Sequence, residues 1–315
     1  MLIVLSLVFA ALPSIAQSPC TETNSSNAFL GISTIRLWPG DAPQAKGTSC
    51  DDIPTLSVMG PQQGHDNGSA VLIFPGGAYR GLASNLEGRQ VADWFTARGF
   101  TAFILRYRLG EKYLLPIPLI DAHRAIQLVR ARARDYHISP SRIVVVGFSA
   151  GGHLAALAAT QPVVGNSEAT DTIERVSSKP DFLVLGYPWI GGVTPDTSAL
   201  SYCDIMHVMD RCAELQKAYS PDHYVTKETP PTFIYHTTDD KTVPVQQALN
   251  FYEALIKAGA SAELHIFANG KHGSGLGTGE ASLDQWPNLL ETWLRDRGLF
   301  AVDEKVIAPK PDWMK

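Results

Sequence analysis

The segment RIVVVGFSAGGHLAALAAT, residues 142–160, joins an apolar run to an alanine-rich stretch through a serine that stands between glycines. The apolar run is typical of a buried strand, and the apolar residues that follow predict a helix. Between these two elements, Gly147, Ser149 and Gly151 form the G-x-S-x-G pattern of a nucleophile elbow. Larger side chains at the two glycine positions would collide in such a turn. We therefore predict that Ser149 projects above a sheet as a nucleophile.

The same alternation of apolar strands and helical stretches continues on both sides of this segment. Strands are predicted at 71–75, 100–107, 142–148, 181–187, 231–237 and 262–267, and helices near 85–98, 119–136, 151–160, 244–258 and 283–297. This order is typical of an α/β fold with a mostly parallel central sheet and helices on both faces. Residues 34–38 and 54–59 are expected to add an antiparallel pair at one edge of the sheet.

The chain is expected to form one domain over residues 17–315, with a core at about 70–298. Residues 191–231 contain Gly, Pro and two of the cysteines, and a connection of that length is usually a lid or binding loop. We interpret it as a short cap insertion. Residues 301–315 read as a surface tail.

The first residues carry the signs of an export signal. Leu2–Leu12 is an uncharged apolar run, shorter than the roughly 20 residues that a transmembrane helix needs. Small side chains at Ser14 and Ala16 fit a peptidase cleavage site, so residues 1–16 are predicted to be a signal peptide and Gln17 the mature start. No Lys or Arg precedes the run, which departs from the usual pattern. The mature protein is expected to be secreted or periplasmic and free of the membrane.

Composition and net charge argue against a nucleic-acid-binding protein and for a chain that folds around a large core. Lys+Arg number 26 and Asp+Glu 31, so the net charge is 26 − 31 = −5, and no basic surface for nucleic acid is expected. With 45% hydrophobic residues the chain can bury a large core.

Export makes the four cysteines candidates for disulfides, since oxidising compartments preserve them. Three pairings are possible. Local pairing of Cys20 with Cys50 and of Cys203 with Cys212 closes the shortest loops and is preferred. No cysteine pair has zinc-site spacing, and no metal site is expected.

A serine nucleophile needs a base to take its proton, and in this type of fold the chain order is serine, acid, histidine. Nine histidines are present. His265 falls inside the alternating strand 262–267, where packing is the simpler interpretation. His272 follows that strand in a glycine-rich loop, so we predict that His272 is the base.

Two neighbouring aspartates follow strand 231–237 and are candidates for the acid. We prefer Asp240, because it begins a D-x-x-V-P pattern whose proline suits the first turn of a helix. Asp239 then bonds the local turn. Asp196 is a remote third option.

The loop after strand 71–75 is expected to complete the site. Its small residues allow the backbone N–H groups of Gly77 or Ala78 to form an oxyanion hole with the N–H of Ala150. Tyr79, Tyr187 and Trp189 fall at strand ends, where they could stack on a sugar or phenolic ring or simply pack within loops.

With FPGGAY, GFSAGGHLAA, DDKTVP and GKHG in these positions, the sequence resembles the α/β-hydrolase superfamily, in particular its secreted bacterial esterases related to acetylxylan and feruloyl esterases. The resemblance covers about 70–298. One departure is Pro75, which stands where the HGGG motif of lipases has His. The resemblance implies hydrolysis of acetyl or feruloyl esters on a plant polysaccharide or oligosaccharide, with no cofactor.

Other interpretations remain open. The same mechanism could serve a general carboxylesterase, a lipase or a peptidase. A lipase should carry a large apolar lid, whereas 191–231 is polar, and a peptidase of this superfamily usually has a propeller domain for which the chain has no room. A catalytically inactive binding domain is disfavoured because serine, acid and histidine all occur in order.

Overall fold

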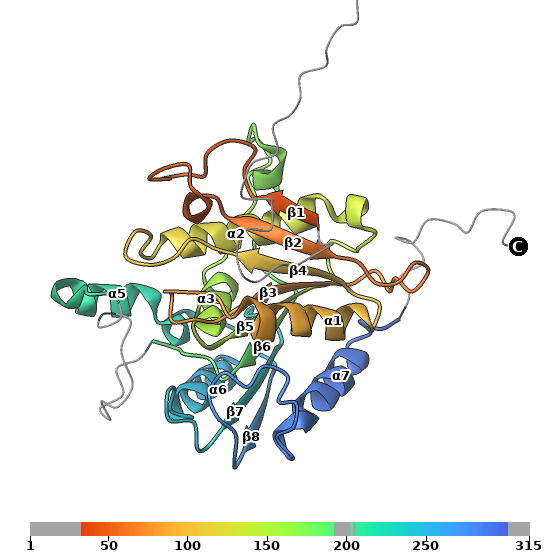
Figure 1. The fold of residues 1–315 in the computed structure, drawn as a ribbon, viewed down its shortest axis with the longest axis vertical. Coiled ribbons are helices and arrows are strands. Elements are labelled where there is room, and N and C mark those ends of the chain that lie inside the picture. Colours follow the sequence, from red (N-terminus) through yellow and green to blue (C-terminus); the bar gives the residue numbers. More distant parts are fainter. Residues whose placement is uncertain (1–32, 192–202, 204–205, 302–315) are drawn as a thin grey trace, which may run out of the picture.

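The computed structural model describes residues 33–191, 203 and 206–301 (Figure 1). Its centre is an eight-stranded sheet of order β1-β2-β4-β3-β5-β6-β7-β8. The strands are β1 Ser33–Arg36, β2 Thr55–Met59, β3 Ala70–Phe74, β4 Thr101–Arg106, β5 Ile143–Phe148, β6 Phe182–Gly186, β7 Thr232–Thr237 and β8 Ala262–Phe267. From β4 to β8 all neighbours run parallel, while β1 and β2 form an antiparallel pair at one edge. Both features confirm the sequence-based prediction.

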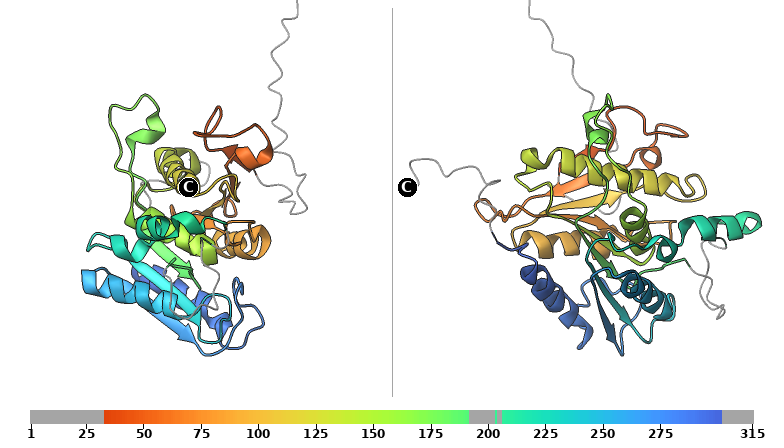
Figure 2. Two further views of the ribbon diagram at one scale, coloured as in Figure 1. Left: turned by 90° about the vertical axis from the view of Figure 1, so that its left-hand side faces the viewer. Right: turned by 180° about the vertical axis from the view of Figure 1, so that it is seen from behind.

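Helices cover both faces of the sheet. Figure 2 shows α1 (Gln90–Thr96) and α7 (Trp286–Asp296) on one face, and α2 (Ile117–Ala131), α3 (Ser149–Thr160) and α6 (Gln246–Ala258) on the other. Side chains of a strand alternate between the two faces, so each strand serves two cores. In β3, Leu72 and Phe74 belong to the cluster under α2, α3 and α6, whereas Val71 and Ile73 belong to the cluster under α1 and α7.

Shorter helices fill the connections. Those of 3₁₀ type in the described part of the chain are η1 Cys50–Asp52, η3 Ala133–Tyr136, η4 Thr172–Arg175, η5 Met209–Arg211, η6 Pro221–Tyr224 and η7 Leu283–Gln285. The stretch predicted as one helix at 85–98 begins instead with a π-helical turn, η2 (Ser84–Arg89), that leads into α1. The wider turn of a π-helix changes which side chains face inward, and such turns are frequent at functional sites.

The cap insertion is described in part. It contains α5 (Cys212–Tyr219), which projects away from the sheet in Figure 1. Cys203 and Cys212 form a disulfide, as the preferred pairing predicts. Cys20, the predicted partner of Cys50, lies outside the described residues, as do the predicted signal peptide 1–16 and residues 302–315 of the tail. In the described part of the chain, no helix is long and apolar enough to cross a membrane.

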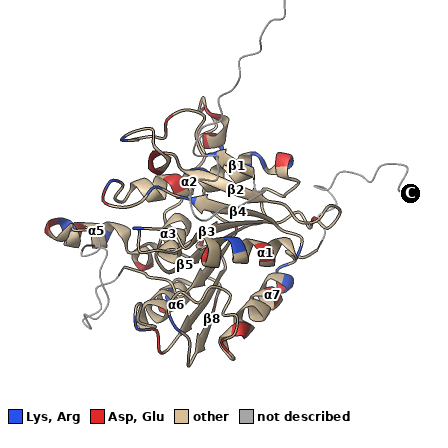
Figure 3. Cartoon of the chain, in the orientation of Figure 1, with Lys and Arg blue, Asp and Glu red and all other residues tan. Residues whose placement is uncertain are grey.

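Charged side chains of both signs are interspersed along the helices and loops (Figure 3). One ion pair is completely buried: the guanidinium of Arg108, just after β4, binds the carboxylate of Asp121 on α2 through Nη2 at 2.6 Å. Asp121 also accepts from the backbone N–H of Arg108. This pair fixes the chain after β4 against α2, so Asp121 has a packing role.

Candidate active site

Ser149 occupies a sharp turn between β5 and α3. Its φ is +52°, a left-handed conformation that L-residues adopt at a cost of about 1–2 kcal/mol. The turn brings the flanking glycines against neighbouring backbone: a Cβ at Gly151 would overlap the carbonyl oxygen of Phe74, and one at Gly147 would overlap that of Gly151. The strained elbow expected from the sequence is therefore present, and both glycines are required by close approach.

Replacing Gly151 by Ala is expected to lower the free energy of unfolding by about 1–3 kcal/mol, the usual cost of forcing an extra methyl group into a packed interior. Urea unfolding would measure the change. Gly60→Ala is the control, because a Cβ at Gly60 has no heavy atom within 4 Å. Equal stability of the two variants would contradict this explanation of the elbow.

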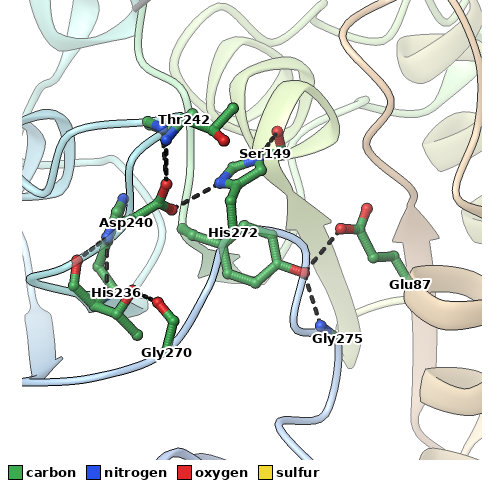
Figure 4. Close-up of polar contacts among 11 residues, drawn as sticks. Glu87, Ser149, His236, Asp240, Thr242, Gly270, His272 and Gly275 are labelled. Atoms are coloured by element: carbon green, nitrogen blue, oxygen red, sulfur yellow. Dashed lines mark hydrogen bonds and ion pairs between the residues drawn. The ribbon is translucent and has the colours of Figure 1, made fainter. Parts of the chain in front are cut away.

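His272 and Asp240 extend a hydrogen-bonded chain from Ser149 (Figure 4). Ser149 Oγ lies 2.8 Å from His272 Nε2, and His272 Nδ1 lies 2.7 Å from Asp240 Oδ2. An ionised carboxylate can only accept, so Nδ1 carries the proton and Nε2 is free to accept from the serine hydroxyl. This is the tautomer that a base acting on Ser149 needs.

Asp240 is held by the turn that follows β7. Its Oδ1 accepts from the backbone N–H groups of Thr242 at 2.8 Å and Val243 at 2.9 Å. Burial by itself raises the pKa of this carboxyl, but the hydrogen bonds from His272 and from the backbone of Val243 outweigh it, so the pKa lies below its usual value. The group is thus an anion at neutral pH, facing the imidazole.

The alternative candidates lie elsewhere. Asp239 is exposed. His265 bonds Glu263 of its own strand β8 at 2.8 Å. Asp196 lies outside the described residues. The structure therefore brings together the preferred residues Ser149, His272 and Asp240, each from the carboxyl end of a different strand.

The loop after β3 lies directly beside the elbow. A Cβ at Gly76 would come within 2.9 Å of Ser149 Cβ. Gly77 and Ala78 are exposed and have φ of +135° and +55°. Within the described residues their N–H groups have no hydrogen-bond acceptor. The N–H of Ala150, in the first turn of α3, lacks an intrahelical acceptor as well and lies at the positive end of the helix dipole. The arrangement suits an oxyanion hole.

Of the two roles left open for Tyr79, Tyr187 and Trp189, their burial favours packing. Tyr79 and Trp189 are 2% and 8% exposed, and both rings pack on His153 of α3. His153 Nε2 lies 2.7 Å from the carbonyl of Tyr219, so it donates, and Nδ1 accepts from the Tyr79 hydroxyl at 2.8 Å. Burial lowers the pKa of His153 to about 4, so the ring is neutral at pH 7. Tyr79 and Trp189 thus support the loop from beneath rather than present a face to a ligand.

Tyr187, the third predicted ring, is 1% exposed and is equally unavailable for stacking. Its ring packs edge-on against His272 with centroids 5.0 Å apart. Its hydroxyl donates to Glu87, a residue that the sequence interpretation missed. A signal was present: Glu87 precedes the buried Val91 and Phe95 by four and eight residues, so helical spacing places it on the apolar stripe.

The residues described in the structure contain no cluster of three or more His, Cys, Asp or Glu side chains able to hold a metal ion. Fold and site together define an α/β-hydrolase. Comparisons with known proteins agree. Residues 56–184 match the family model described as BD-FAE, and residues 198–297 match the prolyl oligopeptidase family model.

Among solved structures, the acetyl ester-xyloside bifunctional hydrolase from Caldicellulosiruptor lactoaceticus shares 36% identity, with 85% of this chain and 97% of that chain covered and a TM-score of 0.73. A thermophilic esterase from Thermogutta terrifontis shares 27% identity over 90% and 97% of the two chains, with a TM-score of 0.68. The chain belongs to the α/β-hydrolase family of esterases related to acetylxylan esterases.

A curated relative, an acetylxylan esterase of Xylanibacter ruminicola, is 31% identical over 78% of this chain and 47% of its own length. The chain thus spans about half of that relative.

Proposed function

We propose that the protein is a serine esterase that cleaves carboxylic esters through Ser149, His272 and Asp240. The observation that carries the proposal is the unbroken chain of hydrogen bonds from Ser149 Oγ through the His272 ring to Asp240, at 2.8 and 2.7 Å. Nucleophile, base and acid are in contact before substrate arrives, as acyl transfer through a serine requires.

In the first half of the reaction, Ser149 Oγ attacks the ester carbonyl carbon while its proton passes to His272 Nε2. The carbonyl oxygen becomes an oxyanion, which the N–H groups of Gly77 or Ala78 and of Ala150 would bind. Asp240 stabilises the imidazolium that forms. His272 then gives the proton to the leaving alkoxide oxygen, the ester C–O bond breaks, and the acyl group remains on Ser149.

Water completes the cycle. It attacks the acyl carbon while its proton passes to His272, and the second tetrahedral intermediate is stabilised by the same donors. Collapse returns the proton to Ser149 Oγ and releases the carboxylic acid. No cofactor takes part in any step of this scheme.

The proposed substrates are acetyl or feruloyl esters on xylan or its oligosaccharides. Support comes from an acetylxylan esterase and an acetyl ester-xyloside bifunctional hydrolase among the similar proteins. The apolar segment 2–12 supports export, and the proposed mature protein is one domain, 17–315, with 191–231 as its cap. Secretion would place the enzyme where plant polysaccharide is met.

A fluorophosphonate probe is expected to label Ser149, and acetylated xylo-oligosaccharides or methyl ferulate are expected to be hydrolysed. Mass spectrometry of the labelled peptide and release of acetate or ferulate measure the two results. Good turnover of aliphatic p-nitrophenyl esters with no activity on the saccharide esters would favour a general carboxylesterase. Cleavage of peptide amides alone would favour a peptidase, and absence of both labelling and turnover an inactive binding domain.

A further inference from the structure

Glu87 lies beneath the site as a buried carboxylate that the catalytic scheme does not use. It belongs to the π-helical turn η2 and is 3% exposed. Oε2 accepts from the backbone N–H of Gly76 at 2.7 Å, and Oε1 accepts from the hydroxyl of Tyr187 at 2.8 Å. The Tyr187 oxygen in turn accepts from the backbone N–H of Gly275 at 2.9 Å, and Figure 4 shows this connection between Glu87 and Gly275. With the contact to Gly76, one carboxylate joins three loops.

The loops that Glu87 joins are the ones that the proposed reaction depends on. Gly76 immediately precedes Gly77 and Ala78, the proposed oxyanion donors, and Gly275 follows His272 by three residues. The carbonyl of Gly275 is fixed as well, since it accepts from the hydroxyl of Tyr235 at 2.8 Å and from Trp286 Nε1 at 3.2 Å. Both the N–H and the C=O of Gly275 therefore form hydrogen bonds, which hold the His272 loop at this residue.

This carboxylate is kept where its charge is unfavourable. Burial raises the pKa of Glu87 above its ordinary value, although the hydrogen bonds from Tyr187 and Gly76 and the nearby His272 act in the opposite direction. The other titratable groups that face it are the hydroxyls of Tyr107 and Tyr235, whose pKa values burial also raises, so they stay neutral. A group that costs stability where it lies invites a functional explanation.

We propose that Glu87 is a positioning residue: through Gly76 and Tyr187 it holds the oxyanion loop and the His272 loop at a fixed spacing around Ser149. This inference rests on the function proposed above. A carboxylate suits the task because each oxygen accepts from a different loop. Glutamine has one acceptor oxygen and presents N–H₂ to the second donor, so it can satisfy only one of the two connections.

Stability and activity should respond in different ways to Glu87→Gln. Since the pKa of Glu87 is raised in the folded protein, its contribution to stability is complete below the ordinary value of 4.5 and is lost as the pH rises through the raised value. Glu87→Gln removes this pH dependence of Tm. It also leaves one buried donor without an acceptor, which destabilises the fold, so Tm should fall by several degrees while the variant stays folded at the assay temperature.

Activity is expected to fall in the same variant. Misplacing a reacting group by about 1 Å can cost about 100-fold in rate, so kcat of Glu87→Gln on p-nitrophenyl acetate should drop about 10- to 100-fold, with KM within about threefold. Asp181→Asn is the matched control. Asp181 is a partly buried carboxylate that accepts from the N–H of Ile143 at 3.0 Å, but it lies at the opposite end of β6 from Tyr187, so kcat should stay within about twofold.

Tyr187→Phe provides a second variant if Glu87→Gln folds poorly. It removes the connection from Glu87 to Gly275 and leaves the one to Gly76. The kcat of Tyr187→Phe should also fall. In the double variant, Glu87→Gln with Tyr187→Phe, the fold loss of kcat should be smaller than the product of the two single losses, because both changes break one chain of contacts.

A kcat of Glu87→Gln within twofold of the wild type would overturn the inference, as would purely multiplicative losses in the double variant or a loss of kcat that disappears once kcat is corrected for the fraction of folded protein. A wild-type protein that neither hydrolyses esters nor reacts with fluorophosphonate would overturn the proposed function itself, and with it this inference.

Discussion

Replacing Ser149 or His272 by Ala is expected to lower kcat for ester hydrolysis by a factor of about 10⁴ or more. Nucleophile and base act as one unit. The serine hydroxyl is a poor nucleophile unless a base removes its proton, and the imidazole has no nucleophile to activate once the serine is gone. The 2.8 Å contact between Ser149 Oγ and His272 Nε2 makes that transfer direct. Steady-state kinetics on p-nitrophenyl acetate measure the loss.

The double variant, Ser149→Ala with His272→Ala, should be hardly less active than either single one, since each change alone disables the unit. Circular dichroism and Tm should show that all three remain folded, because His272 lies at the edge of the structure with 17% of its side chain exposed. Near-normal turnover in a single variant, with host esterases excluded by a mock purification, would remove these residues from the mechanism.

Replacement of the proposed acid, Asp240, is expected to give the second large loss of kcat. Asp240→Asn is expected to lower kcat by about 10³- to 10⁴-fold, whereas Asp239→Asn should stay within about twofold. An amide at position 240 can donate to Nδ1 and so favours the wrong tautomer, with the proton on Nε2 facing Ser149. It also removes the charge that stabilises the imidazolium. The exposed Asp239 has neither contact.

The pair Asp239→Asn and Asp240→Asn is internally controlled, because the same chemical change is made at neighbouring positions. Asp240→Asn should also lose stability at neutral pH. The carboxyl has a lowered pKa in the folded protein, so its stabilising contribution is present above the ordinary value of 3.8 and is lost as the pH falls through the lowered one. If Asp239→Asn were the crippling change, the choice of Asp240 from the D-x-x-V-P pattern would be wrong.

The sheet and the positions of the candidate triad could be predicted from the sequence because both depend on short local patterns of residues. Strand-helix alternation predicted a mostly parallel sheet, and the elbow glycines marked a place where backbone approaches too closely for a Cβ atom. His272 and Asp240 followed because side chains after parallel strands meet at one edge of the sheet.

Side-chain direction was harder to predict. Tyr79, Tyr187 and Trp189 were placed correctly at strand ends, but a strand end does not tell whether a ring points to solvent or beneath the loop. All three point inward, where their polar groups or faces meet His153, Glu87 and His272. Glu87 itself was missed because its two partners, Gly76 and Tyr187, lie 11 and 100 residues away in the sequence, so no local pattern joins them.

The bridge from Tyr79 through His153 to Tyr219 limits how the enzyme can be re-engineered. The acceptor for His153 Nε2 is a main-chain carbonyl at the end of α5, so the cap supplies a group that the core cannot provide. Replacing α5 with a shorter segment would leave the buried Nε2–H group of His153 without its acceptor, near the loop of Gly77 and Ala78. Specificity libraries should therefore vary the outer surface of α5 and keep the backbone at Tyr219 fixed.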